Sequence, residues 1–304
     1  MSKTVNLSKK SARRAGPSAR VPVLLALKAA LADDVLRMLD HEPGARRFLP
    51  EDVHQMRTSV RRMRSDLRFF GPAMERDRSQ TLQEELRWLA GVLGAVRDLD
   101  VLADRLRSAA VEVGAVPRSD PLFEEIARRQ DSSRAALAEA IDGRRYLALR
   151  EAVIAEARAP SPGPSAGREA ASVLVDRLVR DRKRLLDRLK DSPADSPIET
   201  LHELRKRAKR TRYAAHSAAD WLGRREAAGR ACLAIARQAK AIQEVLGCVQ
   251  DASVADAFIR EVADALPADD PFRSAAGALL DHQRREAEEA LACYSALREE
   301  ILGG

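Results

Sequence analysis

The sequence has few aromatic residues, few cysteines and no long apolar run. Aromatic residues make up 4% of the 304 residues, and only three cysteines are present. None of the cysteines forms a CxxC pair or joins a histidine cluster, so neither a disulfide framework nor a zinc site is expected. No stretch reaches the ~18 consecutive apolar residues that a membrane-spanning helix requires. We therefore expect a protein of a reducing compartment that binds no metal.

Motifs of common catalytic machinery are also missing. The sequence contains no Walker loop and no Ser/His/Asp order of a hydrolase. His54 has the side chain of a general base, but no nucleophile or set of metal-binding carboxylates accompanies it. We therefore expect a protein that is not an enzyme and that uses no cofactor.

The N-terminal segment has some features of a secretory signal. Basic residues up to Arg20 precede an apolar run over 21–27. Lys28 interrupts this run, two aspartates follow closely, and the pattern continues as an amphipathic helix. We therefore predict a disordered basic tail over 1–20, followed by a folded, cytoplasmic protein.

Residues that favour helices are abundant. Alanine, leucine, arginine and glutamate dominate, hydrophobic residues make up 45% and charged residues 33% of the chain, and no alternating strand pattern is present. Helices joined by short loops are typical of antiparallel bundles. The fold class is predicted to be all-α, with helices over 22–40, 50–70, 76–96, 98–114, 119–142, 144–158, 168–190, 197–221, 225–247, 249–265 and 270–301.

Two segments of the chain are nearly the same. VHQMRTSVRRMRSDLRFF occupies 53–70 and LHELRKRAKRTRYAAHSA occupies 201–218. A second pair follows, LGAVRDLDVL at 93–102 and LGCVQDASVA at 246–255. A duplication of this size predicts two similar half-domains. The strongest helix breaker lies between the copies, so we predict a first half over 21–159, a Pro/Gly/Ser linker over 160–167 and a second half over 168–304.

Each copy of the first segment carries separate apolar and basic faces when it is placed on a helix. The first copy has an apolar face of Met56, Val60, Met63, Leu67 and Phe70 and a basic row of His54, Arg57, Arg61, Arg64 and Arg68. The second copy has a core face of Leu204, Ala208, Thr211 and Ala215 and a row of His202, Arg205, Lys209, Arg212 and His216.

Like charges at this spacing repel one another, so the basic rows need counter-charge. A solvated face, or ion pairs with acids such as Glu84 and Glu85, would explain one basic helix. Two matching rows with matching histidines favour a bound anion. Arginine forks suit phosphate oxygens, and a histidine with an ordinary pKa near ~6.5 gains charge beside an anion. Few aromatic side chains lie along the rows to stack bases, which favours a phosphate polymer over single-stranded nucleic acid.

With these residues in place, the chain resembles the CHAD family, the conserved histidine α-helical domain. The resemblance rests on H-x-x-R-x-x-x-R-R-x-R at 54–64, on H-x-x-R-x-x-x-K-R-x-R-Y at 202–213 and on the paired LGxxRD and LGxxQD segments. It implies two pseudo-symmetric antiparallel helical bundles with a basic groove or pore between them. It also implies non-catalytic binding of inorganic polyphosphate in that groove.

The resemblance assigns polyphosphate binding to residues of both copies. Asp98 and Asp251 are expected to be structural, and His216 departs from the acid that the family often has at this place. The expected binding residues are His54, Arg57, Arg61, Arg62, Arg64 and Arg87 in the first half, and His202, Arg205, Lys209, Arg210, Arg212 and Lys240 in the second.

Two other functions fit the basic composition. The net charge of +7 and the pI of about 9.6 also suit a helical protein that binds nucleic acid through its phosphate backbone. The other alternative is a structural or granule-surface protein whose basic face docks on the acidic surface of another protein. The expected location is the cytoplasm, at polyphosphate granules.

Overall fold

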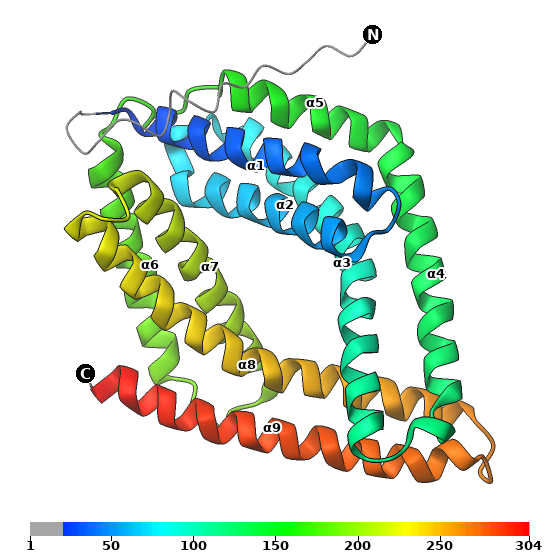
Figure 1. Cartoon of the computed structure of the whole chain (residues 1–304). Coiled ribbons are helices and arrows are strands. Elements are labelled where there is room, and N and C mark those ends of the chain that lie inside the picture. Colours follow the sequence, from blue (N-terminus) through cyan, green and yellow to red (C-terminus); the bar gives the residue numbers. More distant parts are fainter. Residues whose placement is uncertain (1–20, 304) are drawn as a thin grey trace. The chain divides into compact units, whose positions relative to one another are not determined.

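A computed structural model describes residues 21–303, and helices make up most of this part (Figure 1). No β-strand is present within these residues, so the predicted all-α class is confirmed. The tail predicted over 1–20 lies outside the described residues. The α-helices are α1 (Val23–Ala45), α2 (Pro50–Phe70), α3 (Arg76–Glu112), α4 (Asp120–Asp142), α5 (Arg144–Arg158), α6 (Ala170–Lys190), α7 (Ile198–Leu222), α8 (Ala227–Ala265) and α9 (Pro271–Gly303), with short 3-10 helices at Gly71–Ala73 and Val116–Arg118.

Local sequence explains several helix ends. Proline begins α2 at Pro50, where a missing N–H has no cost. The Glu75 carboxylate accepts hydrogen bonds from the backbone N–H groups of Asp77 and Arg78, both at 2.9 Å, and so caps α3. Both basic helices end at a glycine with positive φ, Gly71 at 51° and Gly223 at 83°.

Three predicted helix boundaries were wrong. The segments 76–96 and 98–114 form the single helix α3, and 225–247 and 249–265 form the single helix α8. One glycine costs a helix only about 1 kcal/mol, which neighbouring packing offsets. Helix α1 continues to Ala45, with Pro43 in its last turn, instead of ending near residue 40.

The chain forms two compact units, and each draws on both sides of the 160–167 segment. Apart from the N-terminal residues that are not described, unit 1 consists of residues up to Gly94, Ala136–Lys183 and Arg210–Arg237. Unit 2 consists of Ala95–Ala135, Arg184–Lys209 and Gln238–Gly304. Helices α3, α4, α6, α7 and α8 therefore contribute to both units. The division of the chain into two pseudo-symmetric halves stays a prediction.

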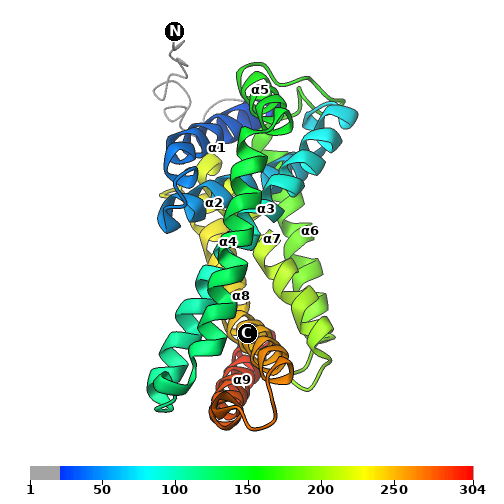
Figure 2. The ribbon, with the colours of Figure 1, turned by 90° about the vertical axis from the view of Figure 1, so that its right-hand side faces the viewer.

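Unit 1 is built around α1 and α2. These helices run side by side, and α5 also packs on α1 (Figures 1 and 2). Leu27 and Met38 of α1 and Met56 and Met63 of α2 are fully buried. Tyr146 of α5 is also fully buried, and its hydroxyl donates a 2.7 Å hydrogen bond to Glu42 of α1. Burial of this apolar area is the main contribution to stability here.

Unit 2 contains two apolar clusters along α8 and α9, whose unit-2 parts run next to each other in Figures 1 and 2. One cluster joins α3 and α4 to α8 and α9 through residues such as Leu106, Ile126, Ile259 and Leu279. The other joins α6 and α7 to α8 and α9, and in it the Tyr294 hydroxyl donates a 2.5 Å hydrogen bond to the Ser192 carbonyl. Among the described helices, none is long and apolar enough to cross a membrane.

Candidate anion-binding site

The apolar face predicted for α2 is confirmed. Met56, Val60, Met63, Leu67 and Phe70 are all buried, with exposures of 0–2%. The basic residues of the same helix are half-buried rather than fully solvated: His54, Arg57, Arg61, Arg64 and Arg68. Arginines with long apolar stems can cover neighbouring helices while their charged ends stay accessible.

The second copy on α7 repeats this division. Leu204, Ala208, Thr211 and Ala215 are buried, as predicted. His202, Arg205, Lys209, Arg212 and His216 are half-buried. Residues 198–209 of this helix belong to unit 2, whereas the helix from Arg210 onward belongs to unit 1. The cations of the second copy are therefore divided between the two units.

Unit 1 brings together cations from both basic helices and α3. The pKa of Arg64 is lowered to about 10, first by burial and then by the charges of Arg68, Arg87, Arg61 and Arg210. The pKa of Arg68 is also lowered, by burial and then by Arg210 and Arg87. Burial and the like charges of neighbouring arginines therefore both act on Arg64 and Arg68. We call Arg61, Arg64, Arg68, Arg87 and Arg210 the arginine cluster.

Arg62, a predicted binding residue, lies in a different environment. Its Nε lies 3.0 Å from Oδ1 of Asp34, an α1 residue with an exposure of only 1%. Burial alone would lower the pKa of Arg62, but the carboxylates of Asp34 and Asp66 outweigh it and the pKa is raised. Arg62 therefore supplies counter-charge to buried acids of unit 1.

A second buried acid, Asp66, links α2 to α7 within unit 1. Asp66 is buried, and its Oδ1 accepts a 2.6 Å hydrogen bond from the Ser217 hydroxyl of α7. Burial raises the pKa of Asp66 to about 6, against the lowering effects of Ser217 and Arg62. This contact holds α2 and α7 together beside the arginine cluster.

The last turns of α7 carry Arg212 and His216. The Arg212 guanidinium carbon lies 4.9 Å from the centre of the Tyr213 ring, a cation–π contact, and Arg212 Nε is buried without a hydrogen-bond partner. His216 also has a buried Nδ1 without a partner, and its pKa is lowered by burial and then by Arg224 and Arg212. His216 therefore adds little positive charge near neutral pH.

Residues of the second repeated segment contact residues of the first. Arg57 lies against Gly94 of α3 in unit 1, and Arg205 lies against Gly247 of α8 in unit 2. In unit 2, His202 Nδ1 is also 2.5 Å from the Gln250 side-chain oxygen.

Asp251 of α8 lies within electrostatic reach of Arg205. Burial raises the pKa of Asp251, and the charge of Arg205 partly opposes this rise. The expectation that Asp251 is structural agrees with this placement next to a base.

The equivalent positions Arg87 and Lys240 have different roles in their units. Arg87 is exposed and belongs to the arginine cluster. Lys240 is exposed in unit 2, where its Nζ lies 3.3 Å from Glu244 one turn later. Surface pairs of this kind contribute little to stability, but they reduce the local positive charge.

The acids suggested as counter-charges for the basic rows bind other residues. Both carboxylate oxygens of Glu85 accept hydrogen bonds from Arg145, at 2.7 and 3.0 Å. Glu84 accepts a 3.1 Å hydrogen bond from Gln80. Arg145 also stacks on Trp88, 4.2 Å from the ring centre. These contacts support the outer face of α3.

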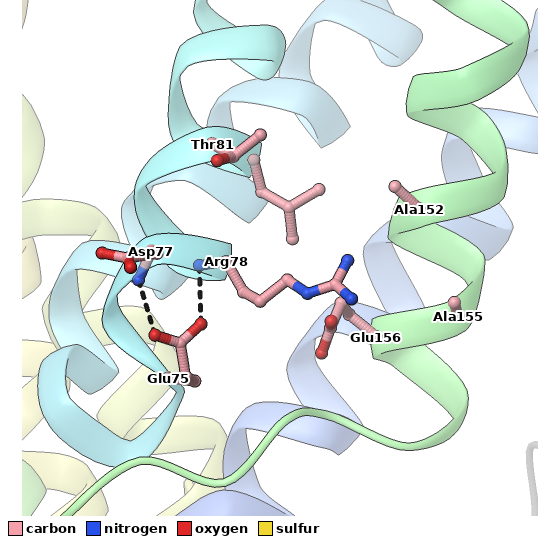
Figure 3. A pocket seen from close by; sticks show the side chains of 8 residues that line it. Glu75, Asp77, Arg78, Thr81, Ala152, Ala155 and Glu156 are labelled. Carbon is pink, nitrogen blue, oxygen red and sulfur yellow. Dashed lines mark hydrogen bonds between the residues drawn. The ribbon is translucent and has the colours of Figure 1, made fainter.

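A pocket in unit 1 lies between the start of α3 and α5, away from the predicted residues. Figure 3 shows the Arg78 side chain extending across it toward Glu156. Glu75 is engaged in capping α3, and Glu156 accepts hydrogen bonds from the N–H and hydroxyl of Ser161, at 2.8 and 3.0 Å. Three carboxylates, of Glu75, Asp77 and Glu156, and a single cation, Arg78, line this pocket, so its charge disfavours an anion. Within residues 21–303, no group of three or more His, Cys, Asp or Glu residues could hold a metal ion.

Sequence reasoning omitted several residues from the expected site. Arg68 was placed in the basic row but not among the binding residues, although its spacing from Arg64 indicated the same face. Gly94, Gly247 and Gln250 were also omitted, and the only sequence signal for them was the repetition of the second segment.

Comparisons with known proteins agree with this architecture. A CHAD domain structure from the plant Ricinus communis is 27% identical, with a TM-score of 0.68, and the match covers 96% of each chain. PptA from Streptomyces chartreusis has the same fold, with a TM-score of 0.74 at 20% identity over 91% of this chain and 99% of PptA.

Two Mycobacterium tuberculosis proteins, the uncharacterized Rv2226 and MT2285, are each 31% identical over 234 residues. The match covers 74% of this chain but 43% of either relative, so the chain spans less than half of their length. The CHAD domain family model matches residues 29–260, which include both basic helices and both copies of the second segment. The chain therefore belongs to the CHAD domain family.

Proposed function

We propose that this protein binds inorganic polyphosphate through the basic faces of α2 and α7. The observation that carries the proposal is the arginine cluster of unit 1, in which cations of both basic helices gather and the pKa of Arg64 falls to about 10. A polyanion would supply counter-charge to Arg64 and Arg68. Guanidinium groups pair well with phosphate oxygens, which a phosphate chain presents at every unit.

A polymer of phosphate fits this cluster better than single-stranded nucleic acid. Base recognition needs exposed aromatic faces, and Tyr213, next to the second basic row, already has the Arg212 guanidinium over its ring at 4.9 Å. Nucleic acid would use the same cations through its backbone only. Membership of the CHAD domain family supports the same choice.

The proposal includes binding without catalysis and a cytoplasmic location at polyphosphate granules. In unit 2, His202, Arg205 and Lys209 would contribute further phosphate contacts. A binding module that recognises stored polyphosphate would bring whatever is attached to it to the granule surface.

Competition binding tests the proposal. Fluorescently labelled polyphosphate of one chain length is bound to the protein and then challenged with unlabelled polyphosphate, single-stranded DNA or double-stranded RNA at equal phosphate concentration. We expect polyphosphate to compete at least about tenfold better than either nucleic acid. The bases of the nucleic acids would add no affinity, because the site has no exposed aromatic faces to stack on them. Equal or better competition by nucleic acid would support the alternative function, and shortening of the polyphosphate during incubation would contradict binding without catalysis.

A further inference from the structure

The second repeated segment has no part in the function described so far. Its leucines, Leu93 and Leu246, are buried in the core, and a buried glycine follows each of them. Gly94 lies inside α3 and Gly247 inside α8. Glycine is one of the least favourable residues inside a helix, and here it occurs at the same place in both copies.

An arginine lies directly over each glycine. A Cβ atom added to Gly94 would lie 3.6 Å from both Nε and Nη2 of Arg57. A Cβ atom added to Gly247 would lie 3.6 Å from Nε and 3.7 Å from Nη2 of Arg205. The same edge of the guanidinium therefore faces the same glycine in each copy. A methyl group would make only ordinary van der Waals contact at these distances, whereas a leucine side chain would extend toward the space that the guanidinium occupies.

In unit 2 this packing holds the Nε edge of Arg205 in place. Nε of Arg205 is buried and has no hydrogen-bond partner in the described part of the protein. With the Nε edge held against the helix, binding to an anion would fall mainly to the outer Nη group. A side chain that is already ordered loses less conformational freedom when it binds.

Unit 2 shows that the second segment also holds the histidine of the first. Gln250 lies one turn after Gly247 on α8, and its side-chain oxygen is 2.5 Å from His202 Nδ1. When Nδ1 donates to this oxygen, the other ring nitrogen is left for a further partner. His202 and Arg205, one turn apart on α7, are thus held by residues one turn apart on α8.

We propose that Gly94 in unit 1 and Gly247 in unit 2 are positioning residues for polyphosphate binding, and that each orients one arginine of its own unit, Arg57 or Arg205, for a phosphate contact. This inference rests on the proposed function. The second repeated segment would then support the first. A larger side chain at either glycine should displace the arginine above it and so weaken polyphosphate binding.

The test uses Gly94→Leu and Gly247→Leu in the full chain, with Gly91→Leu as the matched control. Gly91 lies one turn before Gly94 on α3, and a Cβ atom there would meet nothing within 4 Å. Calorimetry with polyphosphate of one chain length gives the affinity, and thermal unfolding gives the stability. We expect either leucine variant to bind on the order of tenfold more weakly, the loss expected for one charge-assisted phosphate contact, while Gly91→Leu binds like the wild type.

A double-mutant cycle separates positioning from general damage. In an Arg205→Ala background, Gly247→Leu should cause no further loss of affinity, because the residue that it displaces is already gone. Additive losses, or Gly247→Leu affinity within about twofold of the wild type, would overturn the inference.

A smaller substitution covers the case in which leucine prevents folding. Gly247→Val adds less bulk than leucine next to Nε and Nη2 of Arg205, and we expect about a threefold loss of affinity as the γ-methyl groups displace the guanidinium. Unchanged affinity would overturn the inference. If the wild-type protein did not bind polyphosphate at all, the proposed function itself would fail, which is a distinct result from binding that ignores both glycines.

Discussion

Arg62 Nε lies 3.0 Å from Oδ1 of the buried Asp34, and this ion pair separates Arg62 from the other arginines of α2. Arg64, only two positions later, has its pKa lowered to about 10 by burial and by four neighbouring arginines. One helix therefore carries an arginine that stabilises buried acids and another whose pKa is lowered by burial and by like charges. These two environments predict opposite consequences for the same substitution.

Arg64→Gln should weaken polyphosphate binding without lowering stability. The substitution removes a repelled, half-buried charge from the arginine cluster, so the melting temperature should stay the same or rise. Loss of one charge-assisted phosphate contact should reduce affinity by about tenfold. Thermal unfolding and calorimetry on the same preparation check both expectations, and a fall in stability equal to the fall in affinity would contradict them.

Arg62→Gln is the matched control and should behave in the opposite way. Asp34 and Asp66 would lose their nearby positive charge, and we expect the free energy of unfolding near neutral pH to fall by about 1–3 kcal/mol. Polyphosphate affinity should change by less than about threefold, since Arg62 serves buried acids. A large loss of affinity with normal stability would instead place Arg62 in the binding site.

Asp66 predicts a pH-dependent stability. Its pKa is raised from 3.8 to about 6 by burial, despite the hydrogen bond from Ser217 and the charge of Arg62; the carboxylates of Asp220 and Asp33 raise it further. A carboxyl group with a raised pKa favours the folded state when protonated. Its contribution is thus complete below about pH 4 and is lost as the pH rises through about 6.

Asp66→Asn should remove this pH dependence while keeping an oxygen that can accept from Ser217. We expect the variant to be more stable than the wild type at pH 8 by about 1–3 kcal/mol, and the difference to vanish toward pH 4. Urea unfolding across this range measures it. Equal stability of the two proteins at pH 8 would show that the buried carboxylate is better compensated than its surroundings indicate.

Arg57 and Arg205 together should matter more for binding than for folding. Each lies over a glycine on a neighbouring helix, and neither side chain is fully buried. The double variant Arg57→Ala/Arg205→Ala should lose about 100-fold in affinity if each arginine contributes one phosphate contact. Its free energy of unfolding should fall by no more than about 2 kcal/mol. Loss of cooperative unfolding would contradict this division.

The helical periodicity of the sequence predicted much of the fold and of the two basic faces. The apolar positions of α2 and α7 are buried as expected, because a spacing of three and four residues places them on one face. The break expected near residue 97 was wrong, because α3 continues without interruption from Arg76 to Glu112 and tolerates both Gly91 and Gly94. Periodicity within one segment also contains no information on which segments share a compact unit.

The contacts between helices could not be predicted from the sequence. Arg62 and Arg64 belong to the same arginine-rich motif, and only the position of Asp34 on α1 separates their roles. The support that Gly94 and Gly247 give to arginines likewise depends on the packing of α3 on α2 and of α8 on α7. Such distinctions depend on contacts between helices, and the motif that both copies share does not specify these contacts.

The most direct test of polyphosphate binding by the arginine cluster is the dependence of affinity on salt, measured for the wild type and for Arg64→Gln. Binding that neutralises several phosphates releases condensed counterions, so the logarithm of the binding constant should fall against the logarithm of salt concentration with a slope of about −3 or steeper. Arg64→Gln should reduce the size of this slope by about one. A wild-type slope near zero, or a slope that Arg64→Gln leaves unchanged, would contradict the claim that the arginine cluster binds the polymer.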